Sequence, residues 1–181
     1  RELLIDPGQA FGTGAHESTR LALEWVVAIA PGLAAGARVL DVGTGSGVLA
    51  LAALSLSDAR AVVFDLDPLA GSAARENAEV NGLADRLAGF TGPLGALRGG
   101  ESFELVVANL LASELRPIFV PLVERVAPVG RLVLSGLLAA ECAPLLATGE
   151  AAGLRLEGER RREDGSGVAW ASLCMVRLAG S

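Results

Sequence analysis

Short apolar segments alternate with longer helix-like stretches along most of the chain, and this alternation constrains the fold more than any other feature of the sequence. Five segments are brief, rich in Val and Leu, and mostly apolar on both faces, as strands buried between two helical layers should be. They span residues 38–42, 60–65, 86–90, 104–108 and 130–135. Helices are expected around them, at residues 17–30, 48–56, 68–81, 113–126 and 138–152. This order predicts an α/β fold with a doubly wound, mostly parallel sheet.

The pattern changes after Gly153, where two strand-like segments, residues 154–162 and 168–177, flank a glycine-rich turn. This end of the chain predicts an antiparallel hairpin at one edge, which brings the sheet to seven strands. The run Arg160–Arg162, followed by Glu163 and Asp164, is expected to be solvated and paired within its own hairpin. With no linker and no internal repeat in the sequence, we expect a single domain over residues 1–181.

Composition and charge narrow the possible partners. The 181 residues are 51% hydrophobic, and the formal net charge of −6 opposes an extended grip on DNA or RNA. No apolar run approaches the roughly 20 residues that cross a bilayer, so no membrane partner is expected. All basic residues are Arg, and the absence of Lys and Tyr excludes a Schiff-base lysine or a catalytic tyrosine. Cys142 and Cys174 are expected to be buried free thiols of a cytoplasmic protein, and no metal site that joins them to His16 is expected.

A glycine-rich segment, Asp-Val-Gly-Thr-Gly-Ser-Gly-Val at residues 41–48, follows the first predicted strand and opens a helix. This is the place where α/β sheets bind nucleotides, and glycine lets the backbone approach a ligand. A dinucleotide-binding loop needs a third glycine at the position that Val48 occupies, which disfavours a nicotinamide oxidoreductase. The alternative interpretation is that the glycines only make a tight turn.

Two carboxylates follow the second predicted strand. Asp65 ends the strand at about the distance from the glycine loop at which an acid meets ribose hydroxyls. Asp67 faces the same way two residues later, so one of the two is expected to bind ribose while the other caps the helix that starts at Pro68. We favour Asp65 for the ribose because it lies closer to the strand end.

The glycine loop together with Asp65 resembles the class I S-adenosylmethionine-dependent methyltransferases. In that fold the glycine loop lies along the methionine part of the cofactor, and the acid after the second strand binds the ribose. The resemblance therefore implies S-adenosylmethionine as the methyl donor.

Two further segments narrow the resemblance. Residues 11–19 read Phe-Gly-Thr-Gly-Ala-His-Glu-Ser-Thr, and residues 106–111 read Val-Val-Ala-Asn-Leu-Leu. These look like the PrmA family, which methylates ribosomal protein L11 and carries F-G-T-G-x-H-x-T-T before the domain and V-x-A-N-[IL]-L after the fourth strand. The one departure is Ser18, which replaces the first threonine of the final pair. Residues 65–68, 77–82 and 135–136 also match, so the resemblance covers most of the chain.

The resemblance implies a protein N-methyltransferase in which residues 1–20 form a front loop over the cofactor. The substrate-recognition domain that precedes this domain in family members is expected to be absent from this chain. The expected cofactor contacts are Thr13, Gly14, Thr19, Gly43, Gly45, Asp65 and Asn109.

Asn109 is also the expected catalytic residue. An amine must lose its proton before it attacks the methyl group, and the Asn109 carbonyl, with the backbone carbonyl of Leu110, can accept N–H bonds and aim the nitrogen lone pair. The alternative is a turn asparagine that satisfies local backbone. His16 is either a general base or a capping residue, and Glu114 either contacts substrate near the pocket or favours the helix dipole.

Three functions remain open at this point. The first is methylation of lysine side chains or an N-terminal amine of ribosomal protein L11. The second is methylation of a small-molecule amine or another protein. The third is a cofactor-binding module without turnover.

Overall fold

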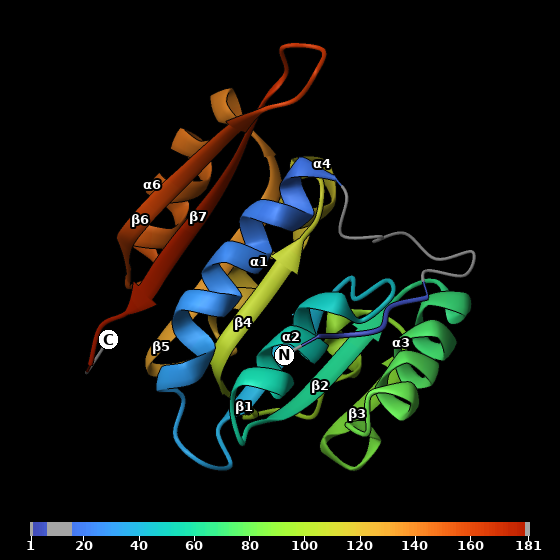
Figure 1. The fold of residues 1–181 in the computed structure, drawn as a ribbon. Helices are drawn as coiled ribbons and strands as arrows, with labels where there is room; N and C mark the ends of the chain where they lie inside the picture. The colour runs from blue at the N-terminus through green and yellow to red at the C-terminus, as the bar shows by residue number, and fades with distance from the viewer. Residues whose placement is uncertain (1, 7–15, 180–181) are drawn as a thin grey trace.

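The computed structural model describes residues 2–6 and 16–179, and within them the chain forms a seven-stranded sheet with helices on both faces (Figure 1). The strand order is β3-β2-β1-β4-β5-β7-β6, in which β7 runs antiparallel to both of its neighbours and the other pairs are parallel. The strands are β1 (Arg38–Val42), β2 (Arg60–Asp65), β3 (Leu87–Thr91), β4 (Phe103–Asn109), β5 (Val126–Leu138), β6 (Leu154–Glu163) and β7 (Ala169–Arg177). The predicted doubly wound sheet with an antiparallel edge hairpin is confirmed.

The helices divide between the two faces of the sheet. One face carries α1 (Glu17–Ile29), α2 (Val48–Leu56) and α3 (Pro68–Val80). The other carries α4 (Ala112–Leu115), α5 (Phe119–Val123) and α6 (Cys142–Ala151). Short 3-10 turns lie at η1 (Ala30–Gly32), η2 (Ala84–Arg86), η3 (Leu94–Ala96), η4 (Arg116–Ile118) and η5 (Ala139–Glu141).

The core has two parts with different side-chain sizes. On the face of α1, α2 and α3, ten of the 21 buried residues in the described cluster are alanine. On the face of α4, α5 and α6, the cluster is built mainly from Leu, Val and Phe, including Phe103, Phe119 and Leu122. Small side chains let α2 and α3 pack close to the sheet, whereas the opposite face is filled by large ones. Cys142 and Cys174 are buried free thiols as expected, and burial raises the pKa of Cys174 to about 12.

Most predicted elements lie within a residue or two of their expected limits, and three differ: the strand expected at residues 130–135 extends over Val126–Leu138, and two helices depart from their expected limits. The single helix expected at residues 113–126 is wrong: the segment is split into α4, η4 and α5. Pro117 and Pro121 cause the division, because proline lacks the N–H that a helix interior needs and clashes with the preceding turn. The helix expected from residue 138 starts only at Cys142, since β5 continues as far as Leu138.

Two arginines of β6 form ion pairs with α1, whereas Arg161 pairs with Glu159 of its own strand. Glu24 of α1 accepts hydrogen bonds from Arg160 (2.8 Å) and Arg162 (2.7 Å) of β6. The guanidinium of Arg160 also lies over the Trp25 ring, 4.1 Å from its centroid. The expectation of pairing within the hairpin is therefore wrong for these two arginines, because α1 packs across β6 and offers a carboxylate that the sequence pattern does not place there.

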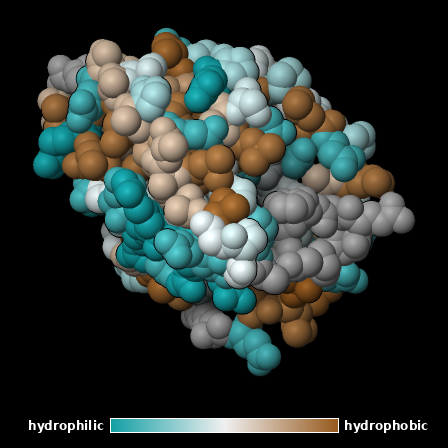
Figure 2. Space-filling model, turned by 90° about the horizontal axis from the view of Figure 1, so that it is seen from above, coloured by the Kyte–Doolittle hydropathy of each residue, from teal (hydrophilic) through white to brown (hydrophobic). Residues whose placement is uncertain are grey.

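The direction in which successive strands are added to the sheet reverses between β1 and β4. From β1 the chain adds β2 and β3 on one side, and it then returns to add β4 on the other side of β1. In the register, Val42 at the end of β1 lies beside Phe64 of β2 and Ala108 of β4. The loops that leave these three strands therefore emerge side by side, at the place where open α/β sheets bind ligands. Figure 2 looks onto the molecule from above and shows hydrophilic and hydrophobic residues interspersed, with a hydrophilic band along one side. In the described part of the chain, every helix is too short or too polar to span a bilayer.

Candidate functional site

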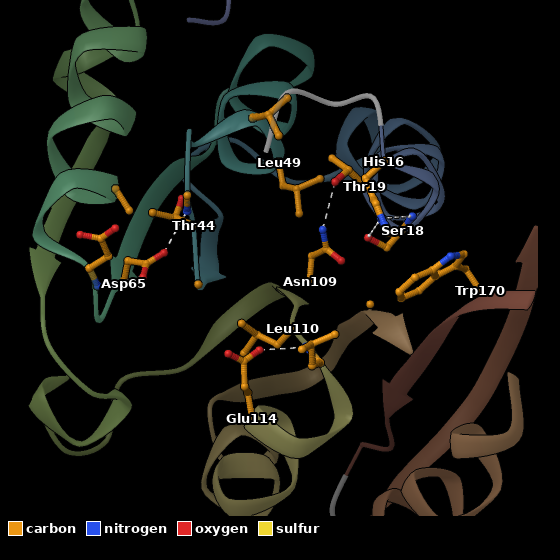
Figure 3. A pocket seen from close by; sticks show the side chains of 17 residues that line it. His16, Ser18, Thr19, Thr44, Leu49, Asp65, Asn109, Leu110, Glu114 and Trp170 are labelled. Carbon is orange, nitrogen blue, oxygen red and sulfur yellow. Dashed lines mark hydrogen bonds between the residues drawn. The ribbon is translucent and has the colours of Figure 1, made fainter. Parts of the chain in front are cut away.

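A pocket of about 450 Å³ opens at this edge of the sheet. Its walls come from the glycine loop after β1, the ends of β2 and β4, the start of α1, and β7 (Figure 3). The predicted site residues Thr19, Gly43, Gly45, Asp65 and Asn109 all line it. The structure therefore brings together every predicted site residue that it describes, whereas Thr13 and Gly14 lie outside the described residues.

The glycine loop needs glycine for two reasons. Gly43, Gly45 and Gly47 have φ angles of 66°, 52° and 82°, in the left-handed region that other residues rarely adopt. A Cβ added to Gly43 would also stand 2.5 Å from Cδ2 of Leu110, in the loop after β4. The backbone of the loop can thus approach the pocket and the β4 loop at the same time.

Asp41 near the end of β1 fixes the glycine loop through hydrogen bonds. The side chain is buried, and its Oδ2 accepts hydrogen bonds from Thr44 Oγ1 (3.0 Å) and from the backbone N–H of Ala50 (3.1 Å). Its Oδ1 has no hydrogen-bond partner among the described residues. Burial raises the pKa of Asp41 to about 6, the two hydrogen bonds oppose this rise, and the nearby charge of Asp65 adds to it.

Asp65 and Asp67 have different roles. Asp67 caps α3, since its Oδ1 accepts from the backbone N–H of Leu69 at 2.9 Å. Asp65 accepts instead from the N–H of Gly45 through Oδ2 and from the N–H of Asp67 through Oδ1, each at 3.0 Å. The prediction that one acid caps the helix is confirmed for Asp67. Asp65 connects the end of β2 to the glycine loop and lines the pocket, and its ribose contact stays a prediction.

Asn109 lies at the end of β4, at the centre of the residues in Figure 3. Its Nδ2 donates to Thr19 Oγ1 of α1 at 3.1 Å, and its Oδ1 is buried without a hydrogen-bond partner among the described residues. The start of α1 is fixed beside it, because Ser135 Oγ donates to the carbonyl of Ser18 at 2.7 Å. The Asn109 amide is therefore oriented by the hydrogen bond at Nδ2, and its Oδ1 remains available as an acceptor.

His16 caps α1, which confirms one of its two predicted roles. Its Nδ1 accepts from the backbone N–H of Ser18 at 3.3 Å and lies 2.8 Å from Ser18 Oγ. The ring also makes an edge contact with Trp170 of β7, with the centroids 4.6 Å apart. Glu114 accepts from the N–H of Leu111 at 3.0 Å, so its carboxylate stabilises the start of α4.

Gly136 belongs to the site although the sequence assigned it no role. It has a φ of 81°, and a Cβ there would stand 2.5 Å from the carbonyl oxygen of Leu110. Leu110 is thus packed between Gly43 and Gly136, which fixes the backbone next to Asn109. The signal in the sequence was the Ser-Gly pair at the end of a strand, but the close contact depends on a segment 26 positions away.

The order of the strands, the glycine loop after β1 and the acid that ends β2 together define the Rossmann-like fold of class I methyltransferases. The family model described as "Ribosomal protein L11 methyltransferase (PrmA)" matches residues 2–176, and the chain belongs to this family. The predicted resemblance is confirmed.

Relatives and solved structures agree with this assignment. A ribosomal protein L11 methyltransferase from Pelobacter propionicus is 48% identical over 139 residues, which cover 76% of this chain and 44% of that protein. One from Syntrophotalea carbinolica is 39% identical over 177 residues, 98% of this chain and 55% of that protein. The crystal structure of a ribosomal protein L11 methylase from Lactobacillus delbrueckii subsp. bulgaricus has a TM-score of 0.78 and 30% identity, covering 96% of this chain and 84% of that chain. The chain thus spans about half the length of the curated relatives it matches.

Proposed function

We propose that this chain is a single methyltransferase domain that transfers a methyl group from S-adenosylmethionine to amines of ribosomal protein L11. The observation that carries the proposal is the Oδ1 atom of Asn109, a buried acceptor with no partner among the described residues, at the wall of the pocket. A buried polar atom without a partner costs free energy, and because Asn109 also lines the pocket, a bound ligand can supply the missing donor. An amine substrate supplies such an N–H.

The residues around the pocket fit the cofactor. The left-handed backbone of the glycine loop leaves room for a ligand beside Gly43 and Gly45, and the Asp65 carboxylate lies next to that loop as an acceptor for ribose hydroxyls. When bound, S-adenosylmethionine supplies an electrophilic methyl group on a sulfonium. We propose that Thr19, Gly43, Gly45, Asp65 and Asn109 contact it, with Thr13 and Gly14 of the front loop.

Asn109 would position the amine rather than remove its proton. Thr19 engages Nδ2, so the amide plane is fixed and Oδ1 is the atom left to accept from the substrate nitrogen. A lone pair held at about 3–3.5 Å from the methyl carbon and in line with the bond that breaks gains several kcal/mol from positioning alone. The acidic balance of the chain, with a net charge of −6, attracts a cationic substrate.

The substrate is proposed from the family. The curated relatives and the Lactobacillus structure are named for ribosomal protein L11, which makes that protein the substrate to test first. A cytoplasmic location is part of the same proposal. A small-molecule amine or another protein remains the second candidate substrate.

Two measurements test the function. Calorimetry should show micromolar binding of S-adenosylmethionine and of S-adenosylhomocysteine and none of NAD, and the opposite pattern would refute the proposal. Transfer of a radiolabelled methyl group should then mark ribosomal protein L11 in a ribosomal extract. The chain contains no lysine of its own, so labelling of its side-chain amines adds no background.

Asn109→Ala separates positioning from binding. We expect S-adenosylhomocysteine affinity to fall by no more than about tenfold, for the loss of one cofactor contact, and turnover to fall by about a hundredfold, because the variant also loses a contact made at the reacting nitrogen. Turnover within about threefold of the wild type would contradict the positioning role. In that case the amide only satisfies local backbone, as the alternative interpretation holds.

A further inference from the structure

Asn77 of α3 and Asn81, the residue that caps the end of this helix, hold residues 4 and 6 near the start of the chain. The side chain of Asn81 accepts from the N–H of Leu4 (3.0 Å) and donates to the carbonyl of Leu4 (2.7 Å). One helical turn earlier, Asn77 accepts from the N–H of Asp6 and donates to the carbonyl of Asp6, both at 2.9 Å. Each side-chain amide therefore pairs with both backbone groups of one residue, as a neighbouring strand would.

The spacing explains why this pairing is possible. Residues four apart on a helix are separated by about 6 Å along its axis, and residues two apart on an extended chain by about 6.6 Å. Asn77 and Asn81 thus match Asp6 and Leu4, with the segment running opposite to the helix. We call this arrangement of Asn77 and Asn81 with residues 4 and 6 the asparagine ladder.

The side chains of the segment support the same geometry. Leu3 and Ile5, which alternate with the residues of the ladder, pack against the alanine-rich core cluster. Leu4 is 61% exposed, so its side chain contributes little and its backbone carries the contact. The hydrogen bonds of the ladder are made to the main chain of residues 4 and 6.

Asn77 makes one further bond that Asn81 does not make. Its Nδ2 also donates to the carbonyl of Ser46, in the glycine loop, at 2.9 Å. The side chain is only 3% exposed, and its two N–H groups and its carbonyl are all used. A single buried amide thus joins α3, the glycine loop and Asp6, the last described residue before residue 16.

We propose that Asn77 is a positioning residue of the cofactor site, which fixes the glycine loop relative to Asp6 in the first part of the front loop. The inference rests on the proposed function, because it assigns Asn77 to the binding of the same cofactor. Asn77 does not line the pocket and acts through Ser46 and Asp6. Asn81 supplies the second rung of the ladder and donates to the backbone carbonyl of Asn77 at 2.8 Å, and among the described residues its side chain makes no hydrogen bond to the glycine loop.

The test compares Asn77→Ala with Asn81→Ala as the matched control. Binding of S-adenosylhomocysteine is measured by calorimetry, and amide hydrogen exchange is measured on the free protein over residues 2–6 and 43–47. Asn77→Ala should weaken binding by about tenfold and speed exchange in both segments, because three hydrogen bonds with the amide are lost. Asn81→Ala should speed exchange at residues 2–6 only and change the affinity by less than about threefold.

Asn77→Asp keeps the test decisive if the alanine variant unfolds. Aspartate has nearly the same shape and still accepts from the N–H of Asp6, but an ionised carboxylate cannot donate to the carbonyl of Ser46 or to that of Asp6, so it should behave as Asn77→Ala does. The inference is overturned if the folded Asn77 variants bind S-adenosylhomocysteine as the wild type does, or if exchange over residues 43–47 does not change. Absence of binding by the wild type would refute the proposed function instead, and the exchange measurement would still decide whether Asn77 holds the two segments together.

Discussion

Replacement of Asp41 by asparagine should remove a pH-dependent cost that the folded protein carries near neutral pH. The buried carboxyl of Asp41 has a folded-state pKa of about 6, raised from 3.8 mainly by burial. Each pKa unit corresponds to about 1.4 kcal/mol, so ionisation of this group destabilises the folded state by about 3 kcal/mol at pH values well above 6. Between the two pKa values the folded state binds the proton and the unfolded state does not.

The sign and size of the effect follow from these values. Because the folded pKa is the higher one, the stabilisation is fully present below pH 3.8 and is lost as pH rises through 6. At pH 5 the folded state is favoured about tenfold by protonation of Asp41, and by pH 8 this advantage is gone. The free energy of unfolding of the wild type should therefore fall by about 1.4 kcal/mol relative to Asp41→Asn between pH 5 and pH 8.

Urea denaturation, followed by tryptophan fluorescence at equal ionic strength, measures both proteins at the two pH values. Subtraction of one protein from the other removes the contribution of the remaining titratable groups. Asp85→Asn, which removes one exposed carboxylate, is the matched control for the loss of a negative charge. A wild-type-minus-Asp41→Asn difference that does not move with pH, or that moves in the wild type's favour toward pH 8, would refute the assignment.

Two further predictions concern packing and charge. Gly136→Ala should lower the free energy of unfolding by at least about 2 kcal/mol, since its Cβ would stand 2.5 Å from the Leu110 carbonyl oxygen in addition to the positive φ. Gly36→Ala has a similar φ of 77° but open space around the new Cβ, so it should cost only the strain of about 1 kcal/mol, and equal losses in urea denaturation would rule out the contact. Glu24→Gln should destabilise the protein by less than about 1 kcal/mol in the same assay, because its pair with Arg160 is partly solvent-exposed, and a larger loss would indicate a more rigid connection between α1 and the hairpin.

Local patterns were sufficient to predict the sheet and part of the site. Strand residues that are apolar on both faces, a glycine loop at a strand end and an acid at the next strand end are all determined by neighbouring residues, so β1, β2 and α2 have the expected limits. Pro117 and Pro121 indicate the break between α4 and α5, but the apolar pattern of residues 113–126 was interpreted as one continuous helix. The division was predictable from proline chemistry alone.

The connections across the site were not predictable in the same way. Thr19 and Asn109 are 90 positions apart, and their hydrogen bond exists because α1 packs over the ends of β4 and β5. Asn77 shows the same limit: its spacing from Asn81 was visible, but the partners at Ser46 and Asp6 depend on how α3 lies against the glycine loop. Sequence spacing identifies which residues lie on one face of a helix or strand, but the partners of that face depend on tertiary packing.

The unequal side-chain sizes of the two core faces predict different consequences of random mutation. On the alanine-rich face most substitutions add atoms, and overpacking there would push α2 and α3 away from the sheet. Gly47 of the glycine loop packs so closely on α3 that an added Cβ would stand only 3.0 Å from Ala74, so a shift of α3 would also displace Gly47. On the other face, substitutions of residues such as Phe119 mostly remove atoms and leave cavities, which lower stability without moving the pocket. Variants that lose cofactor affinity while remaining folded should therefore concentrate on the α1-α2-α3 side, and temperature-sensitive variants with intact binding on the opposite side.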